Sequence, residues 1–136
     1  MVRDLRFTKA AILERCLALS EEHYSAERWE DCIGNSRKFL EGCLQESAAA
    51  YSTRKLGADL VVEIYDKPVK VREFLVSHGL LSDREAKVVG ETYGLLSQVG
   101  NHPNMAANDQ ARLLRQISLL YSEFVMLRVH GTLGRA

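Results

Sequence analysis

The most constraining feature of the chain is a row of apolar side chains near its C-terminal end. They are spaced by four, three, four and three residues: Leu113, Ile117, Leu120, Phe124 and Leu127. In an α-helix this spacing places all of them on one face, because one turn takes 3.6 residues. About 22 residues of helix span roughly 33 Å, enough to cross a small domain. We therefore expect a long helix over residues 109–130 whose apolar row faces the core.

The rest of the sequence also predicts helices joined by short connections. The second long one, over residues 26–51, carries a similar row: Trp29, Ile33, Ser36, Leu40, Cys43 and Ser47. Residues 60–65 are rich in β-branched side chains, but a lone strand would have no partner, so we expect a short helix there. The other helices are expected over residues 8–22, 66–79 and 82–99. The prediction is an all-α, antiparallel bundle of about five helices, forming one domain over residues 1–136.

Local signals mark several helix ends. Ser82 followed by Glu85 has the spacing of a capping box. Gly57 stands where a helix stops. Thr8 and Ser25 are expected to cap the first and second helices. Small residues inside the second helix, Gly34 and Gly42, weaken it, and we expect them to allow a neighbouring helix to come close.

Composition excludes several classes of function. Eighteen basic and eighteen acidic residues give zero net charge, so no overall positive charge indicates nucleic-acid binding. The three cysteines form no C-x-x-C pair, which favours buried reduced thiols over a metal site, and we expect neither a metal nor a cofactor: Cys16, Cys32 and Cys43. No apolar run is long enough to span a membrane, and no signal peptide is evident, so we expect a cytoplasmic protein.

One histidine is the strongest candidate for chemistry. His102 lies between a helix ending at Gly100 and Pro103, in a loop that also contains Asn101 and Asn104. Imidazole titrates near neutral pH, so an accessible histidine in a cleft can act as an acid, a base or a phosphate ligand. From spacing alone, the favoured interpretation is structural, with the ring nitrogens tying the loop to helix-end carbonyls.

Two arginines near the start of the last helix are candidate anion ligands. Arg112 and Arg115 are one turn apart and close in sequence to His102, so they can form a polar rim that binds phosphate. The competing interpretation, which we favour, is that they are solvated or pair with Glu85 or Glu91.

Together these residues resemble a known family. The segment 35–44 and the Gly100-Asn101-His102 sequence before a long apolar helix resemble HEPN-like domains, most closely the abortive-infection C-terminal type. The resemblance covers residues 25–130. It implies a helical bundle from prokaryotic toxin or antiviral defence systems, such as toxin–antitoxin pairs, with a metal-independent ribonuclease site at a dimer interface. His102 matches the family histidine and, with Asn101, Arg112 and Arg115, forms the candidate site.

The family arginine is missing. It is expected with four to six residues between it and the histidine, where this chain has Leu95, Leu96 and Ser97. Serine cannot stabilise phosphorane charge as arginine does. We therefore favour a non-catalytic HEPN-like module for binding and oligomerisation, a homodimer that can bind RNA, a nucleotide or a partner protein. The alternative is a ribonuclease with His102 as general acid/base and Arg112 or Arg115 as the anion clamp, and a third possibility is a plain interaction bundle unrelated to HEPN domains.

Overall fold

The protein is a bundle of helices. The computed structural model describes residues 5, 7–101 and 108–134, with residues 99–101 described by their backbone alone. These residues form six α-helices and a short π-helical segment, η1, and contain no strand: α1 (Ala10–Ser25), α2 (Trp29–Tyr51), η1 (Ser52–Leu56), α3 (Val62–Tyr65), α4 (Pro68–Ser77), α5 (Asp83–Asn101) and α6 (Asn108–Leu133). The predicted all-α fold is confirmed.

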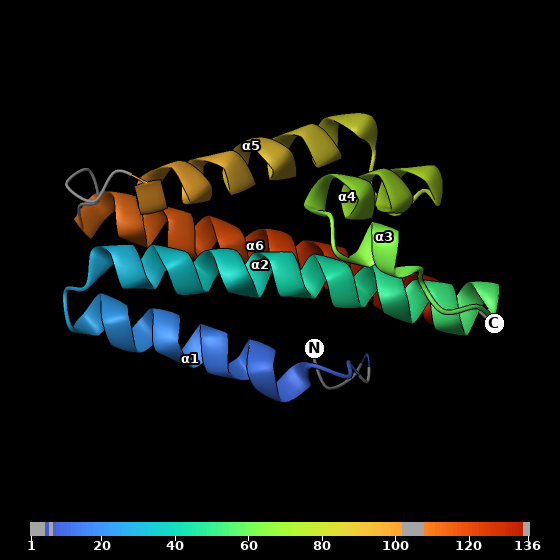
Figure 1. The fold of residues 1–136 in the computed structure, drawn as a ribbon, viewed down its shortest axis with the longest axis horizontal. Helices are drawn as coiled ribbons and strands as arrows, with labels where there is room; N and C mark the ends of the chain where they lie inside the picture. Colours follow the sequence, from blue (N-terminus) through green and yellow to red (C-terminus); the bar gives the residue numbers. More distant parts are fainter. Residues whose placement is uncertain (1–4, 6, 102–107, 135–136) are drawn as a thin grey trace.

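Helix α2 is the centre of the bundle, and it contacts all the other helices. Figure 1 shows α1, α2 and α6 lying lengthwise side by side, with α5 inclined across them and the short helices α3 and α4 at one end. Consecutive long helices run in opposite directions. The row predicted for α2 is confirmed, since Ile33, Leu40, Cys43 and Ser47 are all buried.

Close approach between α1 and α2 depends on one glycine. A Cβ atom added at Gly42 would collide with the side chain of Leu13 on α1, which is itself buried. Gly42 therefore has the packing role that was expected of it. A Cβ atom at Gly34 would meet nothing within 4 Å, so the same expectation is wrong for that position.

In the middle of the chain, the helix ends lie where the local sequence predicts them. Residues 62–65 are helical, and Pro68 occupies the first turn of α4. Gly57 has the left-handed conformation that ends a helix, with φ of 74°. The capping box is formed, because the backbone N–H of Glu85 donates to Ser82 Oγ and that of Ser82 donates to Glu85 Oε1.

Two expected caps are wrong. Thr8 donates its hydroxyl hydrogen to Glu46 Oε1 on α2, at 2.7 Å, and α1 begins after Lys9 without a side-chain cap. Ser25 is the last residue of α1, and α2 begins only at Trp29. The buried carboxylate of Glu46 also accepts hydrogen bonds from the backbone N–H of Lys9 and the hydroxyl of Tyr65, so it holds the start of α1 and α3 against α2.

The predicted orientation of α6 is wrong for the three leucines of the row, whereas Phe124 of the same row is partly buried against the core. The side chains of α6 that reach the core are Ala111, Leu114, Ser118, Ser122, Val125, Met126 and Val129. Leu120 lies nine residues from both Ala111 and Val129, which is two and a half turns and therefore the opposite side of the helix. The leucines of the predicted row point to solvent. Small side chains on the other face let α6 lie close to α2.

None of the described helices is both long enough and apolar enough to cross a lipid bilayer.

Candidate functional site

The centre of the predicted site lies outside the described residues. His102 belongs to the segment 102–107, and Asn101 is the last residue of α5, described by its backbone alone. The catalytic role of His102 and the binding role of Asn101 therefore stay predictions. The structure describes the two helix ends that flank this segment, the end of α5 and the start of α6.

The two candidate arginines have different surroundings. Arg112 is exposed and, with Asn108, Asp109, Leu113 and Gln116, lines a hollow of about 600 Å³ at the start of α6. Arg115 is half-buried, and its Nε donates to Ser20 Oγ on α1 at 3.2 Å. Arg115 thus links α6 to α1 rather than contributing to the hollow that Arg112 lines. Of the four predicted site residues, only Arg112 has a described side chain in a surface hollow.

The suggested pairing of these arginines with Glu85 is not observed. Glu85 pairs instead with Arg128, whose Nη1 and Nη2 donate to the two carboxylate oxygens at 3.1 and 3.3 Å. The backbone N–H of Ser82 and the Arg128 guanidinium together lower the pKa of Glu85 below its usual value. Arg128 also lies over the ring of Phe124, with its Cζ 4.5 Å from the ring centroid.

The cysteines are structural. All three are buried, free thiols, as expected: Cys16, Cys32 and Cys43. Burial raises the pKa of Cys43 to about 12, so its thiol stays protonated at neutral pH and is a poor nucleophile. Burial also raises the pKa of Cys32, although the nearby charge of Arg115 acts in the other direction. In the described part of the chain no cluster of His, Cys, Asp and Glu has the composition of a metal site.

A row of three leucines on α6 forms an exposed apolar surface, which we call the leucine face: Leu113, Leu120 and Leu127. Their exposed fractions are 56%, 63% and 53%. They are spaced by seven residues, and so lie almost in line along the helix. The sequence revealed this row, but its side of the helix was assigned wrongly.

A small groove between α5 and α6 adjoins the leucine face. It has a volume of about 280 Å³ and an almost entirely apolar lining that includes Val88, Val89, Tyr121 and Phe124. Phe124 is four residues after Leu120, so it connects the groove to the leucine face along α6. The ion pair between Glu85 and Arg128 lies at this groove, since both Glu85 and the ring beneath Arg128 line it.

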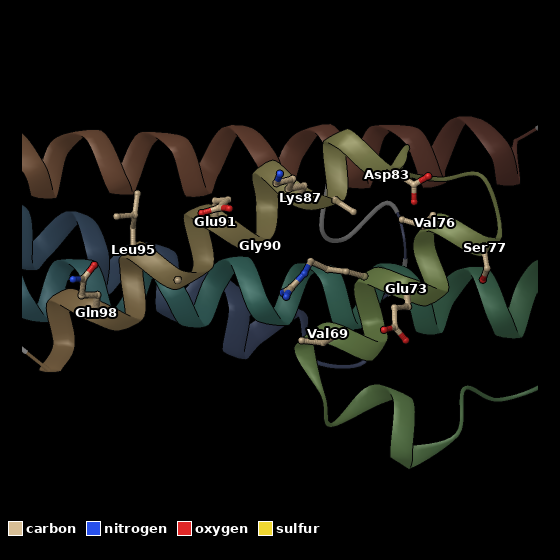
Figure 2. Close-up of a pocket in the computed structure, with 13 residues that line it drawn as sticks. Val69, Glu73, Val76, Ser77, Asp83, Lys87, Gly90, Glu91, Leu95 and Gln98 are labelled. Carbon is tan, nitrogen blue, oxygen red and sulfur yellow. The ribbon is translucent and has the colours of Figure 1, made fainter.

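A second groove, between α4 and α5, has a volume of about 950 Å³. Figure 2 shows α4, with Val69 and Glu73, beside the stretch of α5 that contains Gly90 and Glu91, and all four residues line the groove. Sequence reasoning missed this groove. A signal was present, however, because Ala86, Gly90 and Gly94 are spaced by four residues and leave one face of α5 without large side chains.

Comparisons of the chain with family models, with curated proteins and with solved structures found no match.

Proposed function

We propose that this chain is a non-catalytic helical module that binds a second copy of itself through the leucine face. The observation that carries the proposal is the exposure of Leu113, Leu120 and Leu127 along the solvent side of the 26-residue helix α6. Single exposed apolar residues are ordinary, but several large ones aligned along one face of a helix are typical of an interaction site. Burying it against another protein removes that surface from water.

The shape of the surface favours a second copy as the partner. The leucine face is a ridge, and the α5–α6 groove lies beside it on the same chain. Two copies related by a two-fold axis can each place the ridge of one against the groove of the other, because such an interface uses the same patch twice. The zero net charge also means that two copies do not repel one another at long range.

The biological setting rests on the HEPN resemblance. We propose that the module acts in a prokaryotic defence or toxin system, where it assembles with itself and with a further component, either a protein or an RNA. The support is the all-α bundle and the long last helix that follows the Gly100-Asn101-His102 sequence. The absence of arginine from residues 95–97 supports a binding role over cleavage.

Ribonuclease activity with His102 as general acid/base is the second candidate. It is favoured by Arg112, which is exposed in the hollow at the start of α6 and makes no ion pair with any described residue. A solvent-exposed guanidinium can bind phosphate through two parallel hydrogen bonds. Incubating wild type, His102→Ala and Arg112→Met with tRNA and mRNA tests this. Cleavage lost in both variants would establish the ribonuclease, and intact RNA with wild type would exclude it.

Self-association is tested by measuring molar mass. We expect wild type to run as a dimer in size-exclusion chromatography with light scattering at tens of micromolar. Leu120→Glu places a charge in the middle of the leucine face and is expected to weaken the dimer at least about tenfold, because a buried unpaired charge is costly at an interface. Because Leu120 is 63% exposed in one chain, the fold is expected to survive.

Val62→Glu is the matched control. Val62 lies on α3, is 65% exposed, and is not part of the leucine face. The same chemical change there is expected to leave the dimer intact. A monomeric wild type, or equal effects of Leu120→Glu and Val62→Glu, would contradict the proposal.

A further inference from the structure

The α4–α5 groove has the size and lining of a small-molecule site. Its volume of about 950 Å³ lies within the range of roughly 300–1,000 Å³ that ligand pockets occupy. One wall is the nearly bare surface of α5 at Ala86, Gly90 and Gly94, and the opposite wall includes Val69 and Val76 of α4. In Figure 2 these valines lie across the groove from Gly90. An apolar body can therefore lie along the groove.

A cation lies inside this groove. Arg72 of α4 lines it, and its guanidinium approaches the backbone of α5 at Gly90. A Cβ atom at that position would lie 3.3 Å from Nε and 3.4 Å from Nη2 of Arg72, tighter than an ordinary van der Waals contact. Because Gly90 has no side chain, the guanidinium of Arg72 can lie directly against the backbone of α5. This close fit holds the cation in one place.

Among the described residues, the charge of Arg72 has no direct counter-ion. Its Nη1 has no exposed surface and no hydrogen-bond acceptor, and no carboxylate of the described residues pairs with it. The nearest recorded partner is the ring of Tyr93, whose centroid is 5.9 Å from Cζ. A partly buried guanidinium in this position is stabilised by an anion, because burial weakens the competing hydration of the charge.

The acidic side chains around the groove do not provide that anion. Glu73, Asp83 and Glu91 also line the groove, but all three are exposed, so water screens their charges. Glu73 is in addition paired with Lys70, at 3.4 Å. The basic side chain of Lys87 stands on the same helix as Glu91 and compensates part of the negative charge at the rim. The interior of the groove is therefore cationic while its rim is mixed.

We propose that the α4–α5 groove binds a small amphipathic carboxylate. The carboxylate lies against the Arg72 guanidinium and offsets its charge through a charge-assisted hydrogen bond. The apolar part of the ligand lies along the bare face of α5, against Gly90 and Gly94 and across from Val69. A single cation beside exposed carboxylates suits a monoanion better than a doubly charged phosphate. This site is separate from the leucine face and does not depend on self-association.

Decanoate is the probe that tests the proposal, with decanol and decyltrimethylammonium as uncharged and cationic counterparts of equal chain length. Each is titrated into the full chain by calorimetry below the concentration at which it aggregates. Decanoate is expected to bind with one molecule per chain and more tightly than the other two. Arg72→Met keeps much of the side-chain volume but removes the charge, and is expected to lower the decanoate affinity about tenfold or more.

Three further variants keep the test decisive. A Cβ atom at Gly94 would meet nothing within 4 Å, so Gly94→Leu has room to fold and is expected to fill the groove and weaken decanoate binding. Arg15→Met removes an exposed arginine of α1 and is expected to leave the affinity unchanged. Should Arg72→Met fail to fold, Arg72→Lys keeps the charge without the planar group that fits beside Gly90 and is expected to weaken binding severalfold.

Three results would overturn the proposal: tighter binding of decyltrimethylammonium than of decanoate, unchanged decanoate affinity in the folded Arg72 variant, or unchanged affinity in Gly94→Leu. Changes in molar mass report on the leucine face alone, so failure of one proposal is distinguishable from failure of the other.

Discussion

The two long helices α2 and α6 carry similar apolar rows, and they use them in opposite ways. In α2 the row that includes Ile33, Leu40 and Cys43 is buried in the core. In α6 the three leucines of a row with the same four-three spacing, Leu113, Leu120 and Leu127, face solvent. Spacing alone therefore identifies a helix and one of its faces. It does not identify what lies against that face.

The difference arises from small residues at the contact between the two helices. The buried face of α6 includes Ala111, Ser118 and Ser122, which keep the helix axes close. The hydroxyls of both serines donate to backbone carbonyls one turn earlier, at 2.7 Å, so neither is left without a partner in the core. A serine satisfied in this way packs like a small apolar residue. The central position of α2 then gives α6 its apolar neighbours on that side.

The largest expected effect is on the free energy of unfolding, and it distinguishes two adjacent leucines of α6. Leu114 is 2% exposed and Leu113 is 56% exposed. Leu114→Ala is expected to lower the free energy of unfolding by about 2–5 kcal/mol, because it opens a cavity in the core. Leu113→Ala is expected to change it by about 0.5 kcal/mol or less, as for other surface substitutions. Urea denaturation followed by circular dichroism measures both.

This measurement is made at a protein concentration at which wild type is monomeric, so that stability gained by association does not contribute. Equal losses from the two substitutions would show that both faces of α6 are buried, and the contrast with α2 would disappear.

A smaller effect on stability is expected to distinguish the two glycines of α2, Gly34 and Gly42. Gly42→Ala places a methyl group against Leu13 in the core, and overpacking of this kind costs roughly 1–3 kcal/mol, offset by about 1 kcal/mol of better helix propensity. Gly34→Ala gains the same propensity with open space around it. The first substitution is therefore expected to be neutral or destabilising and the second stabilising, as measured by thermal unfolding. A stabilising Gly42→Ala would mean that α1 does not need this glycine to approach α2.

Much of the fold was predictable because its determinants are local. The capping box at Ser82 and Glu85, the turn glycine Gly57 and the first-turn Pro68 each set a helix end through their own backbone chemistry. The short helix α3 was predicted by excluding a strand without a partner. The caps at Thr8 and Ser25 were not predictable, because Thr8 is drawn away by the distant carboxylate of Glu46 and α1 extends through Ser25.

The surfaces of the molecule were harder to predict than its helices. Which arginine stays exposed depends on partners far along the chain: Arg115 contacts Ser20, whereas Arg112 does not. The cationic groove likewise requires Arg72 of α4 to meet Gly90 of α5. Sequence spacing within one helix contains no information on such pairings, and only the tertiary arrangement supplies it. The roles of Asn101 and His102 stay predictions because their side chains lie outside the described residues.

The smallest expected effect on the free energy of unfolding concerns the ion pair between Arg128 of α6 and Glu85 at the start of α5. Because hydrogen bonds from Ser82 and Arg128 lower the pKa of Glu85 in the folded chain, its ionised form stabilises the fold. That contribution is complete above the unfolded pKa, about 4.3, and is lost as pH falls through the lower folded pKa. Since both partners are partly exposed, Glu85→Gln is expected to cost no more than about 1 kcal/mol at pH 7.

The contribution of Glu85 is measured by urea denaturation of wild type and Glu85→Gln, at neutral pH and at a pH below the folded pKa of Glu85. The difference in free energy of unfolding between the two proteins is expected to shrink in acid. Glu91→Gln is the control, because Glu91 lies on the same helix, is exposed and accepts no hydrogen bond from any described residue. It is expected to have the smaller effect at neutral pH. A difference for Glu85→Gln that persists unchanged in acid would show that the side chain acts through packing rather than charge. In that case Arg128 would hold α6 to the segment before α5 through its hydrogen bond to the backbone carbonyl of Leu80, at 3.3 Å, which does not involve the Glu85 carboxylate.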